Sequence, residues 1–188
     1  MPASTSAAAF RRVRDTGLLR GPERVDSRER ALLHALQAPL WVDGSLRRYR
    51  FPKQRAHRLA AALDFLEAGV APRDPLQLRD WLLDVPGVGP KTASWVVRNH
   101  LSSDEVAIID VHIRRAGLAA GIFDARWRLP RDYGLFEDAF LGWARHGRVS
   151  PALLDACIWG VLAAAGRAAT DILGTAVGPL RPVWPVTA

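Results

Sequence analysis

A chain of 188 residues, 49% of them hydrophobic, is long enough to fold as one compact unit or as two small lobes. It contains no apolar run of about eighteen residues, so we expect no membrane partner. The formal net charge of +7 and the isoelectric point near 10.8 favour a polyanionic partner, and the single cysteine excludes a disulfide within the chain.

Residues 1–21 are rich in alanine and serine and then in arginine. We expect a disordered basic arm here that contacts phosphate, followed by a single compact unit over residues 22–188. The arm's composition also fits an organelle transit peptide. Alanine, proline and arginine are common throughout the chain, however, so the favoured location is the cytoplasm, in association with the nucleoid.

Two helices are predicted on either side of a basic loop. Asp26 and Ser27 can cap the first helix, which ends at Gln37. The second helix is expected over residues 52–68. The loop between them, residues 41–51, interleaves basic and aromatic side chains, a pattern that suits nucleic acid and equally suits a solvated loop. These side chains are Arg47, Arg48, Tyr49 and Arg50.

A stretch rich in glycine and proline joins two short helices that are predicted within residues 76–101. Apolar residues at helical spacing favour a first helix that stops at Pro86, and Pro90 suits the first turn of the second. We expect Gly87 and Gly89 to take backbone angles that a side chain disfavours. The free N–H groups of the second helix would bind a phosphate oxygen. An ordinary corner between two helices would show the same glycines.

Lys91 lies in the first turn of that second helix, where the positive helix end and partial burial would lower its pKa and make its amine a usable nucleophile. Asp110 follows the apolar run 106–109 and occupies a natural N-cap position. A helix, a turn and an extended piece fit between the two residues and can bring them together. An amine and a carboxylate in one cleft can attack an electrophilic carbon. The simpler alternatives are a lysine that contacts phosphate and an aspartate that only caps a helix.

Two more helices are predicted after this pair. The first covers residues 133–146, with aromatic residues at core-like spacing. The second covers residues 151–166 and is strongly apolar except for Asp155, which must be paired or line a cavity. Trp159 lies one turn later on the same face. A salt-bridged aspartate and a core tryptophan are the alternatives to a pocket. The last residues, which include Trp184, are expected to be irregular.

The stretches LLDVPGVGPKTA and VAIIDVHIRR resemble the helix–hairpin–helix, loop and aspartate signature of the DNA glycosylase superfamily. Together, KTASWVVRNH and VAIIDVHI are most similar to the 8-oxoguanine DNA glycosylases of the compact type found in archaea and some bacteria. YRFPKQRAHRLAAALDFL resembles the basic helix before the hairpin in that family, and LLDACIWGVLAAAG resembles its C-terminal helix. The resemblance covers about residues 27–166.

The resemblance implies an all-α helix–hairpin–helix glycosylase fold, with two small helical lobes and a cleft between them. It places Lys91 and Asp110 at the positions of the catalytic lysine and aspartate of bifunctional members. It also implies a base pocket or wedge formed by Gln37, Asp155 and Trp159, although Gln37 can equally be an ordinary residue at a helix end. The implied contacts to the DNA backbone are Val85, Gly87, Val88, Gly89 and Lys91.

The activity that the resemblance implies is base-excision repair by a monomer acting on double-stranded DNA that contains a damaged base. A bifunctional DNA glycosylase and AP lyase would remove an oxidised purine, 8-oxoguanine, by attack of Lys91 on the sugar with help from Asp110, followed by β-elimination. Alternatives are a glycosylase of the same superfamily for another modified base and a non-catalytic helix–hairpin–helix DNA-binding module. The module would keep the hairpin glycines without needing the Lys91/Asp110 pair.

No metal or cofactor is expected. One cysteine cannot supply a four-cysteine iron–sulfur cluster, which argues against the endonuclease III and adenine-glycosylase branches, and the five histidines show no zinc spacing. The compact 8-oxoguanine enzymes commonly end soon after their last helix, with a lysine that helps to read the base. This chain continues past that point and ends Val-Thr-Ala, so its base-reading contacts are expected to differ.

Overall fold

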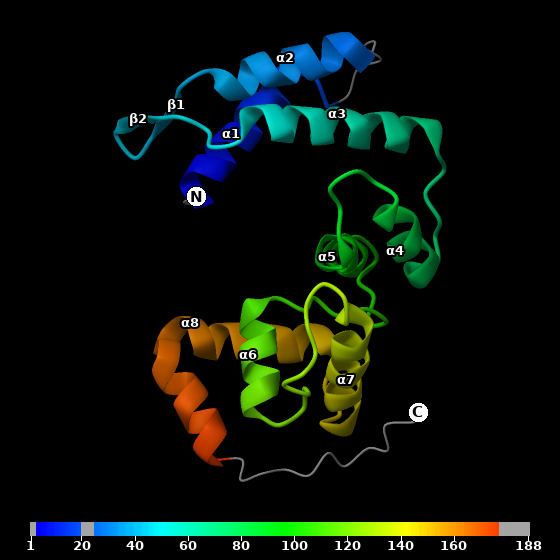
Figure 1. The fold of residues 1–188 in the computed structure, drawn as a ribbon, viewed down its shortest axis with the longest axis vertical. Coiled ribbons are helices and arrows are strands. Elements are labelled where there is room, and N and C mark those ends of the chain that lie inside the picture. Colours follow the sequence, from blue (N-terminus) through cyan, green and yellow to red (C-terminus); the bar gives the residue numbers. More distant parts are fainter. Residues whose placement is uncertain (1–2, 20–24, 177–188) are drawn as a thin grey trace. The chain divides into compact units, whose positions relative to one another are not determined.

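The computed structural model describes residues 3–19 and 25–176 (Figure 1). The chain divides into two compact units, residues 1–71 with 85–87 and residues 72–84 with 88–188. This division replaces the single unit expected over residues 22–188. Helices make up nearly all the regular structure of the described residues, which confirms the predicted all-α class. None of the described helices is long and apolar enough to cross a membrane.

The first unit contains helices and one short pair of strands. In chain order these are α1 (Ala3–Asp15), α2 (Val25–Gln37), β1 (Leu40–Val42), β2 (Ser45–Arg47) and α3 (Pro52–Ala68). Its core forms where α2 lies against α3 and α1 against α2 and β1. The buried guanidinium of Arg28 on α2 binds Asp64 and Glu67 on α3 at 2.6 and 2.8 Å, so an ion-pair cluster also fixes these two helices.

Helix α1 corrects the prediction of a disordered basic arm over residues 1–21. Alanine is the strongest helix former, and residues 3–15 contain several alanines. Thr5, Ala9 and Val13 recur at intervals of four, lie on one face of the helix, and are each less than 5% exposed. This short buried stripe was the signal in the sequence that the overall composition concealed.

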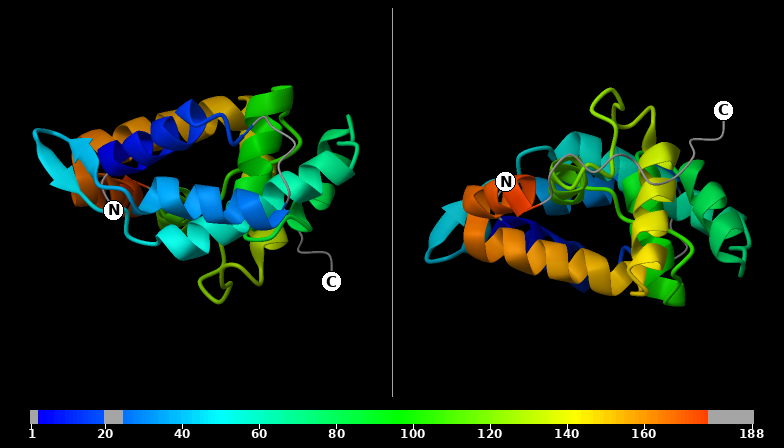
Figure 2. Two further views of the ribbon diagram at one scale, coloured as in Figure 1. Left: turned by 90° about the horizontal axis from the view of Figure 1, so that it is seen from above. Right: turned by 90° about the horizontal axis from the view of Figure 1, so that it is seen from below.

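The loop predicted over residues 41–51 contains an antiparallel hairpin instead. Its turn consists of Asp43 and Gly44, which both have positive φ, at 49° and 75°. Positive φ at both central residues is what a tight two-residue hairpin requires, and Asp-Gly is a preferred pair for it. The hairpin (cyan) extends beyond the helices of its unit in both views of Figure 2.

The second unit consists of α4 (Pro75–Leu83), α5 (Pro90–Leu101), α6 (Val111–Ala119), α7 (Tyr133–His146) and α8 (Pro151–Ala176). Phe136 and Phe140 of α7 are fully buried in its core, and Trp143 packs against Phe140, as their spacing predicts. Helix α8 continues to Ala176, ten residues past the predicted end at Gly166. Trp184 lies outside the described residues.

Candidate active site

The turn between α4 and α5 has the predicted helix–hairpin–helix form, but its two glycines differ. Gly87 has φ of +84°, and a Cβ atom there would lie 2.6 Å from Cδ of Arg58, so this position requires glycine. Gly89 has φ of −111° and ψ of 176°, an extended conformation that any residue adopts. The expectation of an unusual backbone angle at Gly89 is therefore wrong. A Cβ at Gly89 would meet only open space, so this position leaves the start of α5 uncovered.

Lys91 lies in the first turn of α5. The N-cap residue, Gly89, provides no side-chain hydrogen bond, so the N-terminal N–H groups of the helix are not capped by a side chain. The side chain of Lys91 is exposed, which corrects the expected partial burial. The chain has only one other lysine, Lys53, among its 26 basic residues. Arginine stays protonated and is not an amine nucleophile, so nucleophilic amines are rare in this chain.

Asp110 ends an extended segment and caps α6. Its Oδ1 accepts hydrogen bonds from the N–H groups of His112 and Ile113 at 2.7 and 2.9 Å, and its Oδ2 accepts one from the indole of Trp159 at 3.2 Å. Burial raises the pKa of this carboxyl, but these three hydrogen bonds and the charge of Lys91 outweigh it and hold the pKa below the ordinary value. Asp110 is thus both a cap and a stable carboxylate.

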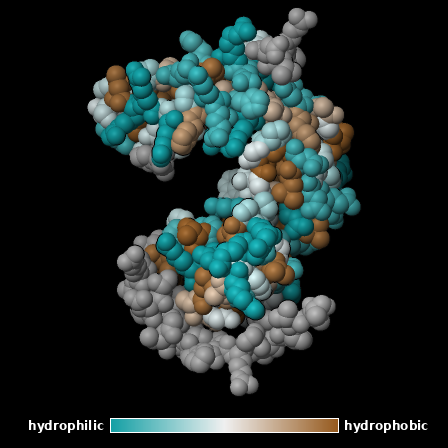
Figure 3. All heavy atoms as spheres, viewed as in Figure 1, coloured by the Kyte–Doolittle hydropathy of each residue, from teal (hydrophilic) through white to brown (hydrophobic). Residues whose placement is uncertain are grey.

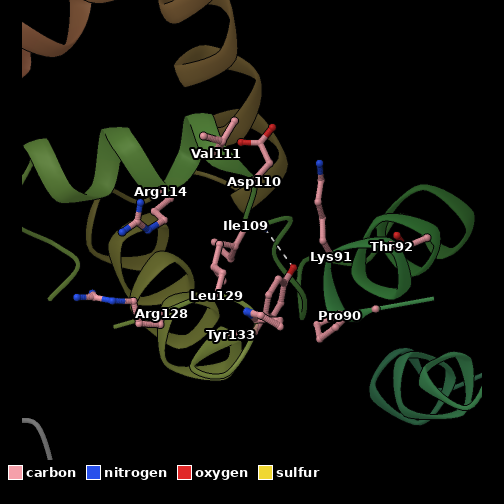
Figure 4. Close-up of a pocket in the computed structure, with 12 residues that line it drawn as sticks. Pro90, Lys91, Thr92, Ile109, Asp110, Val111, Arg114, Arg128, Leu129 and Tyr133 are labelled. Carbon is pink, nitrogen blue, oxygen red and sulfur yellow. Dashed lines mark hydrogen bonds between the residues drawn. The ribbon is translucent and has the colours of Figure 1, made fainter. Parts of the chain in front are cut away.

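The structure brings Lys91 and Asp110 to one cavity of about 590 Å³ within the second unit (Figure 4). Figure 4 shows the side chain of Lys91 reaching from α5 toward the carboxylate of Asp110. The rest of the wall includes Arg114, Arg128, Leu129, Pro130 and Tyr133. A cavity of this size can hold a nucleoside-sized ligand. The proximity of the amine and the carboxylate, which the sequence predicts, is therefore present.

A second cavity, of about 360 Å³, also borders on Lys91 and Asp110 and includes both predicted pocket residues of α8. Asp155 is 7% exposed and forms an ion pair with Arg98 of α5, so this carboxylate is both paired and part of a cavity wall. Trp159 is 49% exposed and is therefore not a core tryptophan. Its ring meets that of His112 edge-on at 5.0 Å.

The remaining predicted contacts are distributed along the chain. Gln37 is exposed at the end of α2 in the first unit. Val85 is buried, so its side chain serves packing and only its backbone can face a ligand, whereas Val88 is half-buried. Arg114 and Arg128 also line the first cavity, and the sequence analysis does not identify them. Arg114 lies one turn after Asp110 on α6, a spacing that could have indicated it, and it has no carboxylate partner among the described residues.

A buried polar network holds the segment that ends at Asp110. Glu137 of α7, 3% exposed, binds Arg79 at 2.6 Å and accepts hydrogen bonds from the hydroxyl of Ser94 at 3.1 Å and the N–H of Ala107 at 2.8 Å. Ser94 lies on α5, three residues after Lys91. One carboxylate therefore connects the helix that carries Lys91 to the segment that carries Asp110. It also accepts a hydrogen bond from a backbone N–H that would otherwise need a neighbouring strand as its partner.

Tyr133 completes the network from the same helix. Its hydroxyl donates to the carbonyl of Ala107 at 2.8 Å and accepts from the N–H of Ile109 at 3.1 Å. Burial raises the pKa of this phenol to about 12, against smaller lowering contributions from hydrogen bonds. Tyr133 thus satisfies two buried backbone groups of the segment and forms part of the cavity wall.

Replacing Tyr133 by phenylalanine should lower the free energy of unfolding by about 1–3 kcal/mol, because a buried N–H and a buried carbonyl lose their partner. Denaturant unfolding measures this loss. The matched control is Tyr49→Phe at the only other tyrosine, whose hydroxyl accepts one exposed hydrogen bond from Arg55; its effect should stay within about 0.5 kcal/mol. Equal effects of the two substitutions would contradict the role of the network.

Replacing Trp159 by phenylalanine should raise the pKa of Asp110, because the indole N–H stabilises only the charged carboxylate. Because the pKa of Asp110 is lower in the folded protein than in the unfolded chain, its charge stabilises the fold above about pH 4. This stability is lost as the pH falls through the pKa of Asp110 in the folded protein. Carboxyl ¹³C NMR titration measures the shift, with the Asp110 signal assigned by its absence in Asp110→Asn. An unchanged pKa in Trp159→Phe would show that the indole does not bind the carboxylate in solution.

Comparisons with known proteins identify a family for the chain. A family model described as 8-oxoguanine DNA glycosylase matches residues 32–146, a range that contains the hairpin, Lys91 and Asp110. The chain is 31% identical over 116 residues to a protein of Metallosphaera sedula named 8-oxoguanine DNA glycosylase/AP lyase. The match covers 59% of this chain and 57% of that relative's length. No solved structure matches the chain significantly.

Proposed function

Because the chain belongs to the 8-oxoguanine DNA glycosylase family, we propose that it removes 8-oxoguanine from double-stranded DNA and then cleaves the strand at the resulting sugar. The observation that carries this proposal is the meeting of Lys91 and Asp110 at one cavity, in a chain with only two lysines. We further propose that it acts as a monomer on the nucleoid in the cytoplasm.

In the proposed reaction, Lys91 gives up a proton to solvent, and the lone pair of its amine then forms a bond to C1′ of the damaged nucleotide. The glycosidic bond breaks, and the base leaves with the electron pair and takes up a proton. Asp110 stabilises the positive charge that develops on the sugar. Loss of a proton from nitrogen and opening of the sugar ring give an imine. Removal of a C2′ proton then expels the 3′ phosphate and nicks the strand.

The contacts that hold DNA are proposed to come from the helix–hairpin–helix turn and from the cations beside the cavity. The backbone from Val85 to Gly89 and the uncapped start of α5 offer N–H donors to a phosphate, together with the charge of Lys91. Arg114 and Arg128 add two guanidinium groups at the cavity wall, which suit phosphate. These contacts are independent of base sequence and would hold the strand while one nucleotide leaves the stack.

The extruded base is proposed to enter the cavity lined by Asp155 and Trp159. The half-exposed indole of Trp159 offers a flat face for stacking, and Trp95 of α5 lies in the same wall. The carboxylate of Asp155, already paired with Arg98, supplies a fixed acceptor beside it. We assign Gln37 the role of a wedge that fills the space left in the duplex.

Borohydride trapping tests the function as a whole. The purified chain is incubated with an 8-oxoguanine duplex and, separately, with a duplex carrying an abasic site, and borohydride reduces any imine to a stable adduct. We expect adducts with both duplexes and release of 8-oxoguanine from the first. An adduct with the abasic duplex alone would move the specificity to another modified base. No adduct and no base release with either would leave a DNA-binding module.

A further inference from the structure

The β1–β2 hairpin of the first unit presents an apolar face that none of the described residues of the unit covers. Trp41 and Leu46 are directly opposite each other in the strand register and therefore point to the same face. They are 69% and 65% exposed, whereas Leu40 and Val42, which alternate with Trp41, are buried in the core. A tryptophan and a leucine paired in solvent at the tip of an extension are an unusual surface for a small unit.

The chain around this face is strongly cationic. From residue 41 to residue 63 there is one acidic residue, Asp43, in the hairpin turn. The exposed cations over the same stretch are Arg47, Arg48, Arg50, Lys53, Arg55 and Arg58. Figure 3 shows hydrophobic side chains among hydrophilic ones at the end of the unit formed by β1 and β2. Aromatic and aliphatic groups surrounded by arginines complement nucleic acid, which offers flat bases between phosphates.

This cationic stretch continues to the helix–hairpin–helix turn. The side chain of Arg58 on α3 lies against Gly87, where a Cβ atom would come within 2.6 Å of it. Arg55 is nearly one turn earlier on α3 and donates from Nε to the hydroxyl of Tyr49 at 3.3 Å, in the segment that leads back to β2. Basic side chains thus connect Gly87, the part of the proposed phosphate-binding turn that belongs to the first unit, with the exposed hairpin of the same unit.

We propose that the β1–β2 hairpin is a second DNA-contacting element, in which Trp41 and Leu46 contact bases where the duplex is opened around the lesion and the neighbouring arginines bind the flanking phosphates. This inference rests on the proposed function. Stacking of a base on an aromatic side chain requires that the base has left its own stack, so Trp41 favours opened over fully paired DNA. The arginine contacts are electrostatic and favour both equally.

Fluorescence anisotropy with the full chain tests the proposal on two duplexes, one fully paired and one carrying a tetrahydrofuran abasic analogue that the amine cannot open. Trp41→Ala should weaken binding to the abasic duplex about tenfold and to the paired duplex less than threefold. Trp41→Phe should retain most of the preference. The matched control is Leu66→Ala, which removes an exposed leucine from the far end of α3 and should change neither affinity.

The arginines are tested separately. The double variant Arg47→Gln, Arg48→Gln should weaken binding to both duplexes alike and reduce the slope of log affinity against log salt concentration by about two. A slope equal to that of the wild type would overturn the phosphate contacts. The midpoint temperature of thermal unfolding of each variant should equal that of the wild type. This result would show that the variants keep the fold.

Three results would overturn the contact between Trp41 and opened DNA. These are a change of less than twofold in Trp41→Ala, an equal loss on both duplexes, or a wild-type dimer in sedimentation that Trp41→Ala dissociates, which would assign the face to a second copy of the chain. Borohydride trapping on a natural abasic site, at enzyme concentrations that saturate the duplex for each variant, separates loss of the Trp41 contact from failure of the proposed function. Trapping by Trp41→Ala should persist, whereas no trapping by the wild type would reject the function itself.

Discussion

Lys91→Gln is expected to abolish trapping and to lower the rate of base release by a factor on the order of 10³ or more, because the variant has no amine to attack C1′. Glutamine keeps the length of the side chain and should leave the fold unchanged, since Lys91 is exposed. Single-turnover kinetics on an 8-oxoguanine duplex measure the base-release rate, and electrophoresis after reduction measures the adduct.

Two matched variants distinguish chemistry from charge. Lys91→Arg keeps the positive charge at the start of α5 but removes the nucleophile, so it should bind DNA as the wild type does and be as inactive as Lys91→Gln. Lys53→Gln removes the only other lysine and should retain base release and trapping. Full base release by Lys91→Gln would mean that water, and not Lys91, attacks the sugar.

Asp110→Asn is expected to slow base removal by about 10²–10³-fold while keeping the helix cap, so its free energy of unfolding should fall less than that of Asp110→Ala. Asparagine caps helices about as well as aspartate, so the side-chain oxygen can still accept from His112 and Ile113. It carries no charge to stabilise a cationic sugar. The substitution therefore separates the two roles that one carboxylate combines in this structure.

Asp110→Ala provides the comparison. It loses the cap as well as the charge, and its free energy of unfolding should fall by about 1 kcal/mol, while its activity should fall as far as that of Asp110→Asn. Denaturant unfolding and single-turnover kinetics on the same samples give both quantities. Near-normal turnover in Asp110→Asn would reduce Asp110 to a helix cap and remove it from the mechanism.

The parts of the structure that the sequence predicts depend on local signals. Pro86, Gly87 and Pro90 punctuate the chain strongly enough to locate both helices of the hairpin. Asp110 between an apolar run and an amphipathic stretch marks the start of α6. The return of Asp110 to Lys91 follows from the short connection between them, which leaves few other paths.

Other parts depend on partners far away in sequence and have no local pattern. Glu137 meets Ser94 across 43 positions, and Tyr133 meets Ala107 across 26, so neither showed its role in holding the segment before Asp110. Helix α1 was not predicted for another reason, because its buried face consists of only three side chains, spaced four residues apart. The β1–β2 hairpin had a recognisable Asp-Gly turn, which the basic residues around it obscured.

The position of the trapped sugar on the chain shows which residue attacks C1′. After borohydride reduction on the 8-oxoguanine duplex, nuclease and protease digestion followed by tandem mass spectrometry identifies the modified residue. Lys53 and Lys91 are the only lysines, so their peptides are easily distinguished. We expect a reduced sugar fragment on Lys91. The same fragment on Lys53 or on an N-terminal amine, with Lys91 unmodified, would contradict it.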